Sequence, residues 1–182
     1  MWKPVLLSAA MLALSPAGFA ATESVSGAEA VVSTAAQEIS RSARDDVADA
    51  VLGNLDVEAI ARFTLGRHGR ALSSAETARY TDAFERFLRR QIANNADQIS
   101  GVELTVTKTL ARNDHDAIVT TQVDRGADRM TLRWRLIERN GKWSVVDLEY
   151  AGIWLAIEQR AQVSAILDRP GATIDTVIAE LN

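Results

Sequence analysis

The spacing of apolar residues changes at Val102 from the period of a helix to the period of a strand, and this change constrains the fold most. Before it, apolar residues recur every three or four positions, as in residues 32–51, which is the spacing of an amphipathic helix. From Val102 on, Leu104 and Val106 alternate with polar neighbours, which is the spacing of a strand with one buried face. After residue 152 the helical spacing returns. Helices, then one sheet, then helices predict an α+β fold built in layers.

Short turn signals divide residues 102–150 into strands. Residues 112–116 and 124–128 are rich in Asp, Asn and Gly, and Asn140-Gly141 is a hairpin signal. Sequential strands joined by such turns form an antiparallel meander, which can leave one face to water. We predict a curled four-stranded antiparallel sheet with helices packed on its concave face, resembling an NTF2-like cone. Alternation along the third strand predicts the two faces of the sheet. Its apolar face carries Met130, Leu132, Trp134 and Leu136, and its polar face carries Thr131, Arg133 and Arg135.

Capping residues predict where the helices before the sheet begin and end. One amphipathic helix covers residues 32–51. Asp56 can cap a shorter helix that ends at Gly66, and Ser73 with Glu76 has the pattern of a capping box that opens the next helix. After the sheet, the apolar spacing predicts one helix that ends before Pro170-Gly171 and a last short helix that contains Ile174, Val177, Ile178 and Leu181.

Residues 1–20 have the pattern of a secretory signal peptide. Their apolar stretch, residues 5–14, is too short to span a bilayer, because a spanning helix needs about 20 residues. Small residues ending in Ala20 place the cleavage before the next residue. A retained membrane anchor is the alternative. We predict a periplasmic protein whose single domain covers residues 21–182.

The composition argues against several classes of function. The chain has no cysteine, which excludes disulfides, a thiolate metal site and a cysteine nucleophile. Its formal charge of −4 argues against a nucleic-acid partner, which needs a basic surface for phosphate contacts. His68 and His115 show no metal-ligand spacing, and residues 113–116 read as a hairpin turn. Motifs for a serine esterase or for nucleotide hydrolysis are also missing from the sequence. We therefore predict no catalytic residue, no metal and no cofactor.

Four segments, taken together in their order and spacing, resemble one known family. Residues 56–87, 131–135, 141–155 and 166–171 are similar to the MlaC family of periplasmic phospholipid carriers, also described as toluene-tolerance auxiliary components of an ABC transport system. The resemblance implies a shuttle that moves phospholipid between an inner-membrane ABC transporter complex and an outer-membrane lipoprotein complex, which maintains outer-membrane lipid asymmetry. We expect this shuttle to be a monomer. One branch of the family is associated with hopanoid lipids, so a hopanoid-related cargo is an open alternative.

A lipid carrier needs a dry pocket, because each methylene group that leaves a membrane for water costs about 0.8 kcal/mol. A twisted sheet under helices can leave such a pocket between its layers. In the family pattern, Leu65, Trp134 and Ile153 fall at pocket-side positions. The same apolar residues could instead form an ordinary core. The predicted lipid-binding residues are Phe63, Leu65, Phe84 and Leu88 on helices, and Met130, Leu132, Trp134, Tyr150, Ile153 and Trp154 on the sheet and the turn after it.

Two other classes of protein stay open at this stage. An isomerase-like enzyme with a hydrophobic pocket would use a buried carboxylate, and Asp147 is the candidate. Strand alternation puts Asp147 on the face of Val145, opposite Leu148 and Tyr150. The second alternative is an adaptor with a filled core that binds only other proteins. The many arginines of the predicted second and third helices are either a docking surface or an ordinary solvated face.

Overall fold

The computed structural model describes residues 17–125 and 128–182. The predicted signal peptide, residues 1–20, lies for the most part outside this range, so its cleavage stays a prediction. None of the described helices combines the length and the apolarity that crossing a membrane requires.

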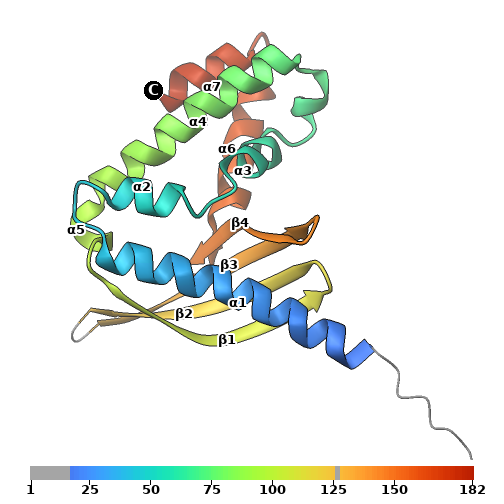
Figure 1. Ribbon diagram of the computed structural model, residues 1–182. Helices are drawn as coiled ribbons and strands as arrows, with labels where there is room; N and C mark the ends of the chain where they lie inside the picture. Colours follow the sequence, from blue (N-terminus) through green and yellow to red (C-terminus); the bar gives the residue numbers. More distant parts are fainter. Residues whose placement is uncertain (1–16, 126–127) are drawn as a thin grey trace, which may run out of the picture.

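Helices precede and follow a single sheet, which confirms the α+β class (Figure 1). The first part of the chain contains α1 (Ala17–Arg41), α2 (Val47–Leu52), α3 (Val57–Leu65), the 3-10 helix η1 (His68–Ala71), α4 (Ser74–Asn94) and α5 (Ala96–Ile99). The strands are β1 (Glu103–Asn113), β2 (Asp116–Arg125), β3 (Asp128–Arg139), β4 (Lys142–Tyr150) and β5 (Ile153–Trp154). The chain ends with α6 (Leu155–Leu167) and α7 (Ile174–Leu181).

The sheet is open and antiparallel, with strands in the order β1-β2-β3-β4-β5. The prediction of four strands is wrong by one, because β5 pairs Ile153 with Tyr150 at the edge of β4. Ala151 and Gly152 form the turn between them, with φ angles of 51° and 84°. Two residues are too few to display an alternating pattern, and alanine is not a usual residue for positive φ, so the sequence carries no signal for this hairpin. The likeness to an NTF2-like cone stays a prediction.

A bulge in β4 overturns one prediction about the faces of the sheet. Leu136 of β3 pairs with Val145, whereas Arg135 pairs with Asp147, so Val146 is an extra residue on β4. The bulge breaks the alternation and brings Val145 and Leu148 to the same face of the sheet. The prediction that Asp147 shares the face of Val145 is therefore wrong, whereas Asp147 and Leu148 still alternate as neighbours on the strand.

The capping residues predicted from the sequence are confirmed at the starts of α3 and α4, but a break between α1 and α2 was not predicted. Asp56 caps α3, where its Oδ1 accepts the Ala59 N–H at 3.0 Å, and Ser73 forms the predicted capping box with Glu76 at the start of α4. The predicted single helix over residues 32–51 is wrong, because α1 ends at Arg41 and α2 begins at Val47. Ser42 donates its hydroxyl to the Ile39 carbonyl at 2.7 Å, a local hydrogen bond that competes with continuation of the helix.

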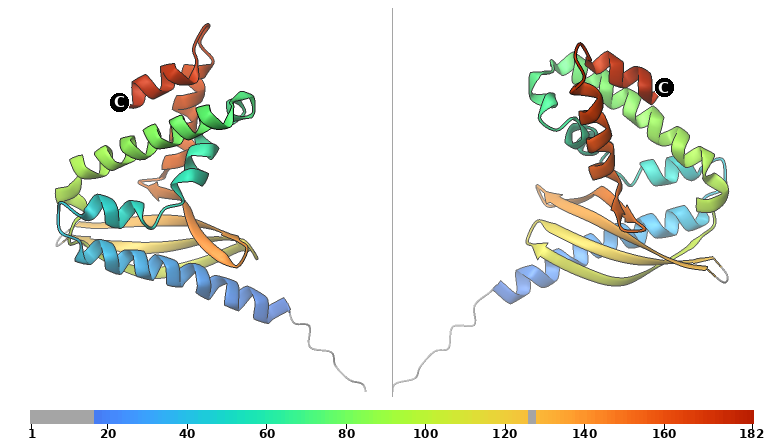
Figure 2. Two further views of the ribbon diagram at one scale, coloured as in Figure 1. Left: turned by 45° about the horizontal axis from the view of Figure 1, so that its top comes forward. Right: turned by 180° about the vertical axis from the view of Figure 1, so that it is seen from behind.

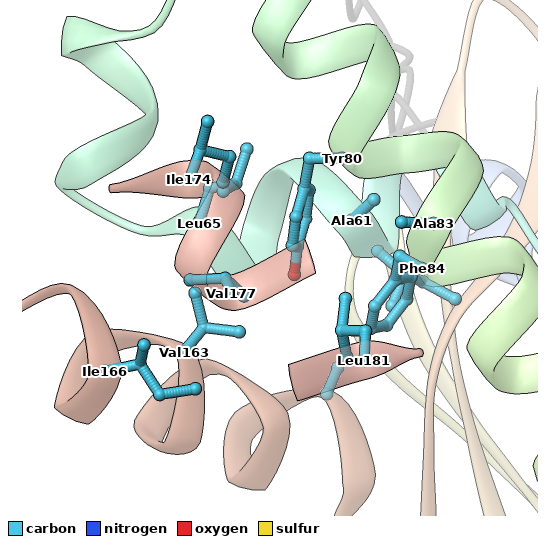
Figure 3. Close-up of a cluster of buried hydrophobic side chains, with 12 residues drawn as sticks. Ala61, Leu65, Tyr80, Ala83, Phe84, Val163, Ile166, Ile174, Val177 and Leu181 are labelled. Atoms are coloured by element: carbon cyan, nitrogen blue, oxygen red, sulfur yellow. The ribbon is translucent and has the colours of Figure 1, made fainter. Parts of the chain in front are cut away.

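One hydrophobic core lies among the helices α3, α4, α6 and α7 (Figure 3). Tyr80 and Phe84 of α4 stack at 5.9 Å between ring centroids and are buried. The Tyr80 hydroxyl shares a hydrogen bond of 2.6 Å with Thr64 Oγ1, so this core contains a satisfied polar pair. Burial raises the pKa of Tyr80 to about 12, which keeps it protonated at neutral pH. We call this group the helical core; its other buried members are Ile60, Ala61, Leu65, Ala83, Ala156, Val163, Ile166, Ile174, Val177 and Leu181.

A second hydrophobic core lies between α1 and the sheet. We call it the sheet core; it consists of Ala28, Val32, Ala35 and Ile39 of α1 with Ala117, Val119, Trp134, Leu136 and Val145 of the strands. Its existence confirms the predicted apolar face of β3. The helical core and the sheet core are separate clusters, and the space between them is where the candidate site lies.

Candidate functional site

A cavity of about 460 Å³ lies between the helical core and the sheet core. Figure 2 shows α6 rising from the sheet near β4, α4 running down toward α5, and α2 between α4 and α1. Ile60, Phe84 and Ala156 of the helical core line the cavity, and Ile39 and Trp134 of the sheet core line it from below. The wall is completed mainly by aliphatic residues, namely Val51, Leu55, Leu88, Ile92, Ile99, Val102, Leu104, Val123, Met130, Leu132, Leu148 and Leu155.

Trp134 forms the floor of the cavity and is held in place by one hydrogen bond. Its indole N–H donates to Thr121 Oγ1 on the neighbouring strand at 2.9 Å. Trp134 is only 2% exposed, and Thr121 is fully buried. Because the single polar group of the indole is satisfied, the ring offers the cavity an apolar surface.

The mouth of the cavity carries uncharged polar groups. Among the lining residues, Gln91, Asn95 and Gln98 are exposed where α4 meets α5, and Tyr150 is 46% exposed at the end of β4. The Tyr150 hydroxyl donates to Met130 Sδ at 3.4 Å. Carboxamide and hydroxyl groups can donate and accept hydrogen bonds without attracting a particular charge. The inner wall of the cavity is therefore mainly apolar, and the polar side chains at its mouth are uncharged.

Asp147 is the one charged side chain among the described residues that line the cavity. Its Oδ1 accepts the backbone N–H of Leu148 and the backbone N–H of Ala156, both at 2.8 Å. Burial raises the pKa of Asp147 above its ordinary value, while the two amide hydrogen bonds and the positive charge of Arg135 oppose that shift. Ala156 is in the first turn of α6, so Asp147 fastens the start of this helix to the sheet. This is a structural role.

Comparison with known protein families matches residues 26–182 to the family described as MlaC protein. The chain belongs to the MlaC family. It is also similar in fold to the phospholipid-binding protein from Ralstonia solanacearum, solved in complex with a phospholipid, with a TM-score of 0.72 and 16% sequence identity. That likeness covers 87% of this chain and 94% of the Ralstonia chain. A search of curated proteins finds no match.

Six of the ten predicted lipid-binding residues line the cavity of this MlaC-family chain. Phe84 and Leu88 face it from α4, and four residues face it from the sheet. The sheet residues lie together because β3 and β4 pair Leu132 with Tyr150 and Trp134 with Leu148. The six residues are Phe84, Leu88, Met130, Leu132, Trp134 and Tyr150.

The structure places Phe63 and Leu65 away from the cavity. Phe63 is 37% exposed on the far side of α3, where the Arg160 guanidinium lies 5.0 Å from its ring centroid. Gly66 makes room for this stacking, because a Cβ there would lie 2.9 Å from Arg160 Nε. Leu65 is fully packed in the helical core. Both residues therefore hold α3 against its neighbours.

Ile153 and Trp154 also lie outside the lining. Ile153 is 52% exposed on β5, beside Tyr150 at the mouth. The guanidinium of Arg133 lies 5.3 Å from the centroid of the Trp154 ring, and Arg133 also pairs with Glu149 at 2.5 Å. Arg133 belongs to the face of the sheet opposite Trp134, so Trp154 is held at that side by a cation–π contact.

Sequence reasoning missed most of the cavity wall that comes from β1, α2 and α5. Val102 just before β1 and Leu104 on β1 alternate with polar neighbours, and that pattern could have identified them. Leu148 could not be found by alternation, because the bulge at Val146 moves it to the cavity face. The carboxamides of the rim carry no sequence signal at all, since exposed Gln and Asn are common on helices.

A second hollow of about 580 Å³ lies between α3, η1 and the first half of α4. It is larger, but its lining includes the charged side chains of Glu58, Arg62, Arg70 and Asp82. Glu58 and Arg62 form an exposed ion pair at 2.6 Å, and hydrocarbon placed here would remove water from these charged groups, so this hollow is unsuited to it. The described residues also contain no group of three or more side chains that could hold a metal ion.

Proposed function

We propose that this chain is a periplasmic carrier that encloses the hydrocarbon of a membrane phospholipid in the cavity between its two cores. The single observation that carries the proposal is a cavity lined by aliphatic and aromatic side chains in a member of the MlaC family. The phospholipid bound by the Ralstonia neighbour, a protein of the same fold, supports the same kind of cargo.

The cavity suits both the hydrocarbon and the headgroup of a lipid. Hydrocarbon gains about 0.8 kcal/mol per methylene on leaving water, so a wall of aliphatic residues around Trp134 can offset extraction from a membrane. The headgroup would stay at the mouth, where Gln91, Gln98 and Tyr150 offer hydrogen bonds. A lipid held in this way is shielded from water during transfer between membranes.

The family and the predicted signal peptide support a proposal for the wider setting of this carrier. The carrier would exchange phospholipid with an inner-membrane ABC transporter complex and an outer-membrane lipoprotein complex, and so maintain outer-membrane lipid asymmetry. A hopanoid-related cargo is the alternative, and the mass of the lipid that copurifies with the protein separates the two.

The contacts of Asp147 disfavour the isomerase-like alternative. Its Oδ1 accepts two backbone N–H groups at 2.8 Å, which gives the carboxylate a structural role at the start of α6. The described residues that line the cavity include no second charged side chain and no histidine to complete an acid–base pair with it. Binding and transport therefore fit this site better than proton transfer.

Matched charge substitutions test the proposal. Leu132→Glu puts a carboxylate into the cavity wall, whereas Ile153→Glu puts one on the exposed edge strand beside the mouth. An unpaired charge in an apolar wall costs several kcal/mol, so we expect Leu132→Glu to abolish uptake of phospholipid from vesicles and Ile153→Glu to retain it. Both variants are checked for folding by circular dichroism. Full uptake by a folded Leu132→Glu variant would contradict the proposal.

A further inference from the structure

Part of the cavity wall has to move when hydrocarbon enters or leaves, because a close-packed interior leaves little room for a bulky lipid to slide through. Most elements of the wall belong to one of the two cores. Ile39 of α1 and Trp134 of β3 are members of the sheet core. Ile60 of α3, Phe84 of α4 and Ala156 of α6 are members of the helical core. Moving any of these elements would disrupt a packed core.

The wall formed by α2 is the exception. Val47, Ala48 and Leu52 of α2 are buried, yet none of them is a member of the helical core or the sheet core. Val51, which lines the cavity, is only partly buried and packs against the outside of the sheet core. Figure 1 shows α2 between α4 and α1, and it contacts both. Moving α2 would therefore leave both cores intact.

The segment around α2 is a short span between two anchored ends. Before it, Ser40 Oγ donates to the Val102 carbonyl at 2.6 Å, and after it, the Asp56 N–H donates to a carbonyl of β4 at 2.9 Å. The helix itself has six residues, and the side chain of its N-cap residue Asp46 makes no capping hydrogen bond. Helices shorter than about 12–15 residues are marginal without tertiary support. We call residues 42–54 the strap.

Two exposed ion pairs hold the strap against its neighbours. Arg44 of the strap pairs with Asp97 of α5 at 2.5 Å, and Asp49 of the strap pairs with Arg89 of α4. All four side chains are between 44% and 75% exposed. Ion pairs that are so exposed contribute little to stability, and salt screens them. Both pairs can therefore open at a small cost in free energy.

We propose that the strap is the wall element that moves during lipid exchange, and that its two ion pairs set how often it opens. This inference rests on the proposed function and adds how exchange at the same site is regulated. An open strap would expose Val47 and Leu52 to water, which keeps the closed form dominant. It would also uncover the cavity beside Val51, so that the hydrocarbon has room to move.

Lipid exchange by variants that lack the ion pairs tests this proposal. The protein is loaded with pyrene-labelled phosphatidylcholine and mixed with phosphatidylcholine vesicles that contain a quencher lipid, and the loss of fluorescence gives the exchange rate. We expect Arg44→Gln and Arg89→Gln each to speed exchange about two- to fivefold, and the double variant by about the product of the two. The matched control Arg169→Gln removes the exposed pair with Glu180, outside the cavity lining, and should exchange at the parent rate.

Salt gives a second readout with the same assay. Raising the salt concentration from about 50 mM to about 500 mM should speed exchange by the parent protein and leave the double variant unchanged. Equal exchange rates in the parent protein and the folded double variant overturn the proposal and leave the proposed function standing. A parent protein that takes up no lipid overturns the proposed function instead.

A tether across the strap tests the movement itself. The chain has no cysteine, so Asp49→Cys/Arg89→Cys introduces the only two thiols, at residues whose side chains touch. A short bismaleimide then fixes α2 to α4. We expect exchange to be at least about tenfold slower than in the same variant capped with N-ethylmaleimide, because a closed wall limits the rate. The control tether Arg169→Cys/Glu180→Cys should leave the rate unchanged. Equal rates in the tethered and capped forms of the strap variant overturn the proposal.

Discussion

The indole N–H of Trp134 and the hydroxyl of Thr121 form a buried hydrogen bond of 2.9 Å between neighbouring strands, directly beneath the cavity. Replacing Thr121 by valine keeps the shape of the side chain and removes the acceptor. The indole N–H then stays buried without a partner, and we expect the free energy of unfolding to fall by about 1–3 kcal/mol. Urea denaturation measures the change.

The control for this variant is Thr105→Val on β1, where the threonine is exposed and the substitution should change stability by less than about 0.5 kcal/mol. Equal effects at both positions would show that the hydrogen bond to Trp134 contributes nothing of its own.

Two phenylalanines with different surroundings should respond very differently to truncation. Phe84 is buried in the helical core and also forms part of the cavity wall, so Phe84→Ala should lower the free energy of unfolding by about 3–5 kcal/mol. Phe63 is 37% exposed and contacts Arg160, so Phe63→Ala should cost only about 0.5–1 kcal/mol. Thermal and urea unfolding of both variants provide the comparison. A loss at Phe63 as large as that at Phe84 would contradict the assigned cores.

Asp147 should make the protein less stable as it ionises. Its pKa is raised in the folded state by burial, so its contribution to stability is fully present below the unfolded pKa and is lost as pH rises through the folded value. An asparagine keeps an oxygen for the N–H groups of Leu148 and Ala156 and carries no charge. At pH 7 we therefore expect Asp147→Asn to be at least as stable as the parent protein, with unchanged lipid transfer.

The alanine variant at the same position separates the charge from the hydrogen bonds. Asp147→Ala leaves the two N–H groups without their acceptor and should lose about 1–3 kcal/mol of stability. If Asp147→Asn lost as much, the negative charge itself would be stabilising at the start of α6.

Asp168 should stabilise the protein when it is ionised, so its contribution to stability depends on pH in the opposite direction to that of Asp147. The hydrogen bond from Arg67 holds the pKa of Asp168 below its ordinary value of 3.8, with smaller contributions from the positive charge of Arg67 and from His68. The stability from this pair is present above the unfolded pKa and is lost as pH falls through the folded pKa. We expect Arg67→Gln to reduce the loss of stability between pH 4 and pH 2, as measured by urea midpoints. Identical pH profiles for the variant and the parent protein would contradict this contribution.

Much of the fold was predictable because local chemistry and hydrophobic spacing agree over long stretches. The N-cap at Asp56, the capping box of Ser73 and Glu76, and the hairpin at Asn140-Gly141 are all where local chemistry puts them. The break after Arg41 escaped prediction, because the buried residues Val47 and Leu52 continue the apolar spacing of α1 across it.

The candidate site was predictable only in part, because contacts between distant parts of the chain decide which apolar residues reach the cavity. Apolar residues on β3, such as Met130 and Leu132, reach the cavity because strand alternation determines their face. Phe63 and Trp154 are equally apolar, yet each is covered by an arginine from a distant part of the chain. No local pattern distinguishes an aromatic ring in a cavity from one under a guanidinium, since both need only a hydrophobic surface.

The most direct test of the central claim is native mass spectrometry of the protein purified from the periplasm without detergent. The account predicts that the protein carries an endogenous lipid at one copy per chain, and that Leu132→Glu abolishes this lipid while Ile153→Glu retains it. Parent protein that is repeatedly free of lipid, and that takes up none from phospholipid vesicles, would contradict the account.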